Sequence, residues 1–249
     1  MELWQALLLI AAGMFAGFVN TVAGGGSLLT LPIMIFMGLS PNVANASNRV
    51  AIFVQNIFGV LGFRSKGVNA WPYSLYLGIS ALFGAIIGAK IAVDISGDLF
   101  NRILAIVMVG VVIVTIFNPV KKVSAESEKM SVKRQALGIV TFFFIGIYGG
   151  FIQAGVGFLI MAAITSINHI SLVKTNSAKV FIVLIYTLAS LAVFTIEGTI
   201  DWLWGGVLAI GNSIGAWIGA RWQVKRGDKW VKRVLIVMVI ALAIRLWLF

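Results

Sequence analysis

Long apolar runs alternate with short polar segments along most of this 249-residue chain. The runs show no alternation of apolar and polar positions, so they do not resemble the strands of a membrane β-barrel. A run of about 20 apolar residues is long enough to cross a membrane as an α-helix. The pattern therefore predicts an all-α polytopic membrane protein. The predicted segments are Leu3–Val19, Leu28–Leu39, Val50–Phe63, Trp71–Val93, Leu99–Phe117, Leu137–Ile152, Phe158–Ile167, Val180–Ile196, Trp202–Trp222 and Val231–Phe249.

One polar stretch, Asn118 to Arg134, divides these ten segments into two groups of five. After this stretch the hydropathy pattern starts again, including an early interruption by glycines. We therefore predict a first membrane repeat over residues 1–118, a cytoplasmic linker over 119–134 and a second membrane repeat over 135–249.

The two groups also match residue by residue, which indicates two homologous halves with one fold. Ser47 to Val50 lies over Ser177 to Val180, and Gly17 to Asn20 reads like Gly150 to Gln153 after a small gap. A single constant offset produces the remaining matches, which are Gly67 with Gly198, Trp71 with Trp202, Gly84 with Gly215, Gly88 with Gly219, Lys90 with Arg221, Arg102 with Arg233, and Leu104 with Leu235.

Charge predicts that the halves insert in opposite orientations. The loop with Arg64 and Lys66 is basic, whereas its repeat partner with Glu197 and Asp201 is acidic. Basic short loops stay in the cytoplasm, so equivalent loops should face opposite sides of the membrane. Such inverted repeats are typical of secondary transporters, whose substrate site lies near the midplane. If the first two segments of a half form a re-entrant hairpin, three crossings remain and the orientation is unchanged.

Composition agrees with this class and limits the chemistry. Apolar residues make up 60% of the chain, charged residues 11%, and the mean hydropathy is +1.04. The absence of cysteine excludes disulfides, thiolate metal sites and cysteine nucleophiles. We assign the net charge of +11 to cytoplasmic loops rather than to nucleic-acid binding. With one histidine and no acid inside an apolar run, we expect no enzyme activity, no metal and no cofactor.

The most informative segment is the glycine run between the first two apolar segments. Three consecutive glycines weaken a helix by about 1 kcal/mol each, so the helix should break there. The next segment would rise only about 18 Å, which places the break inside the membrane. A following helix presents free N–H groups and a positive dipole end, which suit an anion. Close helix packing is the alternative, and we favour it for Gly84 and Gly88. The candidate binding residues are Asn20, Gly24, Gly25, Gly26 and Ser27, with Gln153, Gly155 and Gly157 in the second half.

A second candidate region opens the third segment of each half. It contains Asn48 and Arg49 in the first half, and Asn176, Ser177 and Lys179 in the second. Ordinary N-capping and a snorkelling cation are the alternative. However, the cation recurs in both halves, on predicted opposite sides of the membrane. We therefore interpret Arg49 and Lys179 as anion guides, one for each entrance.

These features predict a secondary transporter of small anions. A proton-coupled transporter usually has a carboxylate or histidine within the membrane, and every acid here lies at a terminus or in a loop. The inside-negative potential alone drives anion efflux, at about 2.3 kcal/mol per charge per 100 mV. An anion channel and a non-transporting assembly or receptor subunit are the alternatives. The expected partners are the anion and the lipid bilayer, without nucleic acid, and a homo-oligomer is compatible with such a chain.

The segment from Gly17 to Ser27, followed by Pro32, resembles the sulfite exporter TauE/SafE family, as do Asn45 to Arg49 and the weaker glycine motif at Gly155 and Gly157. The resemblance extends over nearly the whole chain. It implies a plasma-membrane permease that exports sulfite, sulfonates or related organic acids. It also points to the glycine-run residues as the binding site, whereas Val156 interrupts the second glycine motif and argues against symmetric binding.

Overall fold

A computed structural model describes residues 1–69, 72–117, 130–231, 233–234 and 237. Every regular element in these ranges is a helix, as the hydropathy pattern predicts. The helices are α1 (Leu3–Val22), α2 (Ser27–Phe36), α3 (Pro41–Arg64), α4 (Tyr73–Asp94), α5 (Gly97–Phe117), α6 (Val132–Phe151), α7 (Val156–Asn168), α8 (Leu172–Ile196) and α9 (Trp202–Arg226).

Five of these helices, α1, α4, α6, α8 and α9, are long and apolar enough to cross a membrane. Their outer faces carry large exposed apolar side chains, which suits contact with lipid. Phe15, Phe83, Phe144, Leu188 and Ile214 are examples, each more than 40% exposed. The predicted multi-pass membrane class is confirmed.

The helix boundaries differ from the predicted segments mainly at polar ends. Helix α3 begins at Pro41 rather than Val50, and α8 begins at Leu172 rather than Val180. The polar residues in these first turns face the protein interior, so hydropathy alone did not include them. Helix α6 begins at Val132, inside the predicted linker, whose residues 119–129 lie outside the described ranges. Most of the predicted segment 231–249 also lies outside them.

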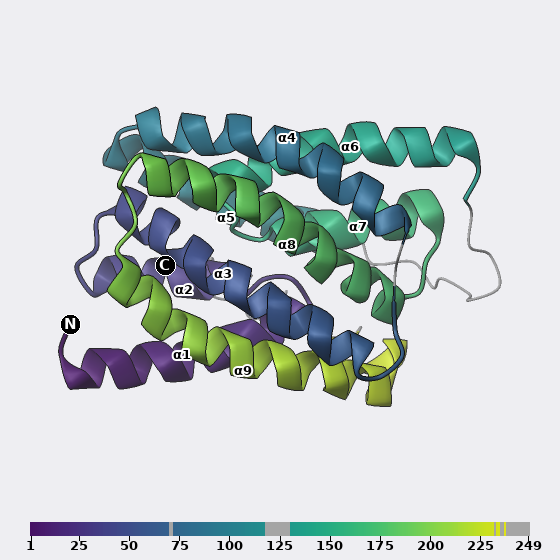
Figure 1. The fold of residues 1–249 in the computed structure, drawn as a ribbon, viewed down its shortest axis with the longest axis horizontal. Helices are drawn as coiled ribbons and strands as arrows, with labels where there is room; N and C mark the ends of the chain where they lie inside the picture. Colours follow the sequence, from purple (N-terminus) through teal and green to yellow (C-terminus); the bar gives the residue numbers. More distant parts are fainter. Residues whose placement is uncertain (70–71, 118–129, 232, 235–236, 238–249) are drawn as a thin grey trace.

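Helices α1 and α2 form one hairpin, and α6 and α7 form another. Helix α1 enters from the end that carries the N-terminus, and α6 enters from the opposite end (Figure 1). Each is followed by a short helix, α2 with 10 residues and α7 with 13. The two hairpin tips meet inside the bundle, where Gly24 and Gly157 are in backbone contact.

Helices of the first predicted repeat pack against helices of the second. Helix α1 packs against α9 of the other half, and its counterpart α6 packs against α4. Glycine makes these pairs close: a Cβ on Gly88 would lie 1.9 Å from the Ile147 carbonyl oxygen, and one on Gly215 would lie 2.0 Å from that of Met14. The packing interpretation of the glycines at 84 and 88 is therefore confirmed.

This packing revises the repeat alignment of the first helix. A Cβ on Gly17 would meet Asn212, and a Cβ on Gly146 would meet Ala81. Since the predicted constant offset pairs Ala81 with Asn212, Gly17 corresponds to Gly146. The predicted match of Gly17 with Gly150 is therefore wrong by one helical turn. The sequence allowed this error because Gly17 and Gly150 are each followed by phenylalanine, whereas Gly146 is followed by isoleucine.

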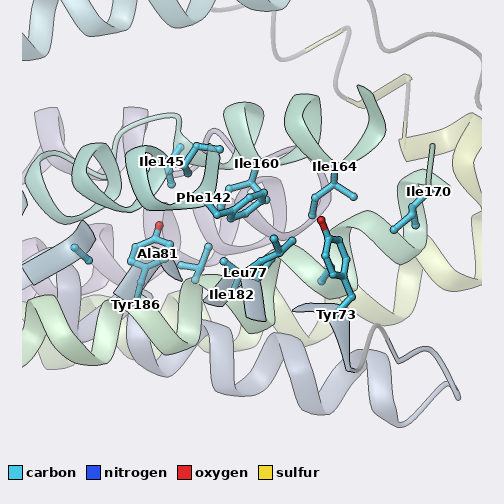
Figure 2. Close-up of a cluster of buried hydrophobic side chains, with 14 of the residues drawn as sticks. Tyr73, Leu77, Ala81, Phe142, Ile145, Ile160, Ile164, Ile170, Ile182 and Tyr186 are labelled. Atoms are coloured by element: carbon cyan, nitrogen blue, oxygen red, sulfur yellow. The ribbon is translucent and has the colours of Figure 1, made fainter. Parts of the chain in front are cut away.

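A buried apolar cluster fills the space between α4, α6, α7 and α8 (Figure 2). Leu77 of α4, Phe142 of α6, Ile160 of α7 and Ile182 of α8 meet there. Lipid is as apolar as these side chains, so close packing rather than exclusion from water stabilises the cluster. The cluster holds the α6–α7 hairpin against the long helices.

The two ends of the bundle differ in charge. The α8–α9 connection lies beside the start of α3, because the Asp201 amide donates to the Ser47 hydroxyl at 2.8 Å. The end of α9 lies beside the start of α8, where Asp228 accepts from the amides of Leu172 and Val173. The helix ends and connections at the first end contain Glu2, Asp94, Asp98, Glu197 and Asp201 with Lys90 and Arg102. Those at the second end contain Arg64, Lys66, Lys133, Arg134, Lys174, Lys225 and Arg226 with Asp228.

Candidate functional site

Both hairpins break at the predicted glycine segments. Helix α1 ends at Val22 and α2 begins at Ser27, with Gly24 in the left-handed region at φ 98°. Helix α6 ends at Phe151 and α7 begins at Val156, with Gln153 at φ 63° and Gly155 at φ 69°. The residues between the helices of each hairpin are all buried. The breaks therefore lie inside the protein and not in bulk water.

The breaks leave backbone amides without acceptors. The amides of Leu28 and Leu29 donate to the carbonyls of Gly25 and Gly26. For the amides of Gly25, Gly26 and Ser27, no acceptor is found within the described part of the chain. The same holds for Gly155 and Gly157 in the second half. Buried N–H groups without partners are rare in proteins, so these five amides are candidates for binding an anion.

The hairpin tips are closed on each other in this conformation. A Cβ on Gly24 would lie 2.6 Å from the Cα of Gly157, and a Cβ on Gly25 would lie 2.8 Å from the Phe158 ring. No solute fits between backbones at such a distance. A substrate can reach the amides only after the tips separate.

Arg49 of α3 is completely buried and binds the end of α6. Its Nη1 donates to the Gly149 carbonyl and, at 2.7 Å, to Gln153 Oε1. Its Nη2 donates to the Gly150 carbonyl at 3.0 Å and to Asn45 Oδ1 at 3.2 Å. The Phe194 ring centroid lies 5.5 Å from the guanidinium carbon. Arg49 Nε is buried and has no partner among the described residues.

Lys179 of α8 is 2% exposed and binds the end of α1. Its Nζ donates to the carbonyls of Asn20 at 2.8 Å and Thr21 at 2.9 Å, and to Asn176 Oδ1 at 2.7 Å. An ammonium has three N–H donors, so all of them are used.

The two cation sites are equivalent by the repeat. The register that pairs Gly17 with Gly146 also pairs Asn20 with Gly149 and Thr21 with Gly150, whose carbonyls bind the two cations. The neighbouring asparagines match as well, since Asn45 Nδ2 donates to the Phe151 carbonyl at 2.9 Å and Asn176 Nδ2 to the Val22 carbonyl at 2.7 Å. In each case, an asparagine and a cation from one half bind the broken helix of the other half.

The interior around these sites is positive. Among the buried polar side chains that the structure describes are two cations and no carboxylate. Each cation faces the C-terminal end of a helix, which carries about half a negative charge.

The remaining predicted residues lie near this centre or beside a cavity. Asn20 is half-buried, and its Cβ lies against Gly26. Asn48 Oδ1 accepts from Thr30 Oγ1 at 2.9 Å, while its Nδ2 has no partner among the described residues. The Ser177 hydroxyl lies 3.5 Å from the Val68 carbonyl. Asn20 thus lies at the first break and Asn48 beside α2, whereas Ser177 lies beside Val68, away from the breaks. A binding role for these residues stays a prediction.

The alternative for the second region, N-capping with a snorkelling cation, is wrong. The N-caps are Ser40 for α3 and Ser171 for α8, so the polar segments lie within the helices. Arg49 and Lys179 do not reach the surface. Both side chains lie in the protein interior. The structure therefore does not place them at the entrances, where the sequence analysis expected them.

The candidate binding residues did not include every member of this network. Asn45, which belongs to the segment that resembles the family, donates to the Phe151 carbonyl as Asn176 donates to the Val22 carbonyl. Gln223 of α9 accepts from Asn176 at 2.7 Å, and Tyr186 of α8 donates to Gln153 at 3.0 Å. Gln223 faces its partner across 47 residues of chain, and no local pattern marks it.

A cavity of about 370 Å³ opens between the C-terminal end of α3 and the N-terminal ends of α4 and α8. It lies at the basic end of the bundle. The residues that line it are Val60, Arg64, Val68, Asn69, Ser74, Ser177 and Phe181. A guanidinium, an amide and two hydroxyls thus share one cavity with apolar walls.

Several relatives of this chain are named as probable membrane transporter proteins. The chain is 26% identical to a probable membrane transporter protein (ORF9) of Sinorhizobium over 96% of its length and 90% of the relative's. It is 26% identical to a probable membrane transporter protein of Haemophilus influenzae, with coverages of 93% and 90%. The Escherichia coli probable membrane transporter protein YfcA is 24% identical, with coverages of 96% and 88%. No solved structure matches.

A family model matches residues 9–246, nearly the whole chain. Its description is sulfite exporter TauE/SafE. The match includes both hairpins, the buried cations and the long helices around them. The chain is thus a multi-pass membrane protein that belongs to the sulfite exporter TauE/SafE family, a family of membrane transporters.

Proposed function

We propose that the protein is a secondary transporter that exports a small anion, sulfite or an organosulfonate or related organic acid, across the plasma membrane. The observation that carries this proposal is the positive interior: two buried cations, no buried carboxylate in the described ranges, and five amides without acceptors. A negative solute gains from each of these, and a cation from none.

The buried basic side chains and the amides without acceptors favour a small, negatively charged substrate. Hydrogen sulfite and sulfonates are anions of this kind. Transfer of the anion from water to these N–H donors costs little reorganisation, because the amides belong to helix starts that are already in place. Ser27 adds a hydroxyl donor at the first helix start.

Alternating access is the mechanism that the closed tips support. Gly24 and Gly157 touch at the centre, while the 370 Å³ cavity opens at the basic end. The positive-inside rule assigns this end to the cytoplasm. In our proposal the anion enters this cavity, the hairpin tips separate, and the halves then close behind it. Outward movement of one negative charge is favoured by about 2.3 kcal/mol per 100 mV.

Flux into proteoliposomes tests the proposal. We expect saturable flux of labelled sulfite or of a small sulfonate, and Ser27→Ala and Asn20→Ala should raise KM several-fold because donors near the break are lost. Lys90→Ala, which removes an exposed cation of α4, is the matched control and should leave flux unchanged. A protein that moves no anion of a panel of sulfite, thiosulfate, sulfonates and carboxylates would refute the proposal. Flux that rises with anion concentration without saturating would indicate a channel.

A further inference from the structure

The ends of α1 and α6 are places where a transporter usually binds a coupling ion. In transporters with broken helices, unwound carbonyls and half-helix C-terminal ends coordinate Na⁺ or protons. The negative end of the helix dipole adds to the attraction for a cation. This protein has two such ends, and both lie inside the bundle.

Both ends are occupied by the protein's own side chains. Lys179 Nζ has three oxygen neighbours at 2.7 to 2.9 Å, two of them the carbonyls of Asn20 and Thr21. The Arg49 guanidinium bonds the carbonyls of Gly149 and Gly150 at the other end. The next carbonyl of each helix accepts from an asparagine amide. Lys179 is 2% exposed and Arg49 is fully buried, so a metal ion would have to compete with these side chains for the same carbonyls.

We infer that Lys179 and Arg49 replace the coupling cations of this transporter: each fills a monovalent-cation site at a broken helix end. The consequence is that anion transport needs neither Na⁺ nor K⁺, and each turnover moves the charge of the anion alone. The inference rests on the proposed anion transport and adds the mode of coupling to it.

Ion replacement in the wild-type protein tests the consequence. We expect equal anion flux in Na⁺, K⁺ and N-methylglucamine media, and faster flux when a valinomycin potential pulls the anion. Allosteric coupling typically changes an affinity by about 5- to 150-fold. A loss of flux in this range when N-methylglucamine replaces Na⁺ would overturn the inference, as would flux that ignores the potential.

Chemical rescue tests the sites themselves. Lys179→Ala should lose flux and unfold at a lower temperature, and methylammonium should restore both with a saturating concentration dependence. Guanidinium should do the same for Arg49→Ala. Tetramethylammonium is the control solute because it has no N–H donor. Lys90→Ala should not respond to any of the three solutes.

A second variant keeps the test decisive if the alanine proteins do not fold. Lys179→Met has similar length and no charge, so it removes the cation while filling the space. Flux and melting temperature equal to wild type in Lys179→Met would overturn the inference. If the wild-type protein moves no anion at all, the proposed function fails, yet the melting temperature of Lys179→Ala in methylammonium still decides whether Lys179 fills a cation site.

Discussion

Arg49 and Lys179 show how a charged side chain is accommodated inside an apolar bundle. Burial of an unpaired charge costs several kcal/mol even after relaxation. Here each charge is offset by carbonyls at a helix end, by an asparagine oxygen and, for Arg49, by Gln153 and the face of Phe194. Gln153 is the most constrained of these partners, because it bonds both Arg49 and Tyr186 from a left-handed backbone.

Two substitutions at Gln153 separate its side chain from its backbone. Gln153→Ala removes the acceptor of Arg49 Nη1 and Tyr186 Oη, and we expect a loss of stability of about 1–3 kcal/mol. Gln153→Gly loses the same bonds, but glycine adopts a positive φ without the penalty of about 1–2 kcal/mol that a Cβ brings. Thermal unfolding in detergent should therefore rank wild type above glycine and glycine above alanine. An alanine variant as stable as the glycine variant would contradict this account.

At the scale of elements, helix pairs between the halves depend on small residues. Helices α1 and α9, and likewise α4 and α6, approach so closely that backbone lies against backbone. In lipid such contact stabilises helix pairs through packing, since no hydrophobic driving force acts between them. Glycine also allows close backbone contact between the hairpin tips, at Gly24 and Gly157. This contact closes the candidate site rather than forming a long helix interface.

Two glycines on α9 test this packing with a matched control. A Cβ on Gly215 would lie 2.0 Å from the Met14 carbonyl oxygen, whereas one on Gly206 meets nothing within 4 Å. Gly215→Ala should force α1 and α9 apart at a cost of about 1–3 kcal/mol. Gly206→Ala should be neutral or stabilise the helix by up to about 1 kcal/mol. Thermal unfolding measures both, and equal effects would mean that α1 and α9 do not pack as described.

At the scale of the whole molecule, each predicted repeat supplies the basic side chain that binds the broken helix of the other repeat. Helix α3 of the first half binds the broken helix α6, and α8 of the second half binds α1. Neither hairpin can move far without breaking bonds to the other half.

Labelling of single cysteines tests the predicted orientation. Lys66 and Glu197 are exposed, are paired by the constant repeat offset, and belong to a chain without cysteine. With a membrane-impermeant maleimide, Glu197→Cys should react in intact cells. Lys66→Cys should react only in inside-out vesicles. Reaction of both variants from the same side would disprove inverted insertion.

Much of the fold could be predicted because the relevant signals are local. Apolar run length predicts the helices, glycine propensity predicts the breaks, and repeated residues predict two similar halves. The glycine segments also indicated where the candidate site lies. The same local signals misplaced the match of Gly17, because several glycines compete for one alignment.

The sequence alone thus determined the membrane class and the helix breaks, and it predicts two related halves. Tertiary structure decided what the cations do, since Arg49 and Lys179 bind carbonyls 100 to 159 residues away. It also decided that the tips at Gly24 and Gly157 are closed and that a cavity opens at the basic end. The physical reason is that propensity and hydropathy act between near neighbours, whereas hydrogen-bond partners and close backbone contacts exist only once distant helices are packed together.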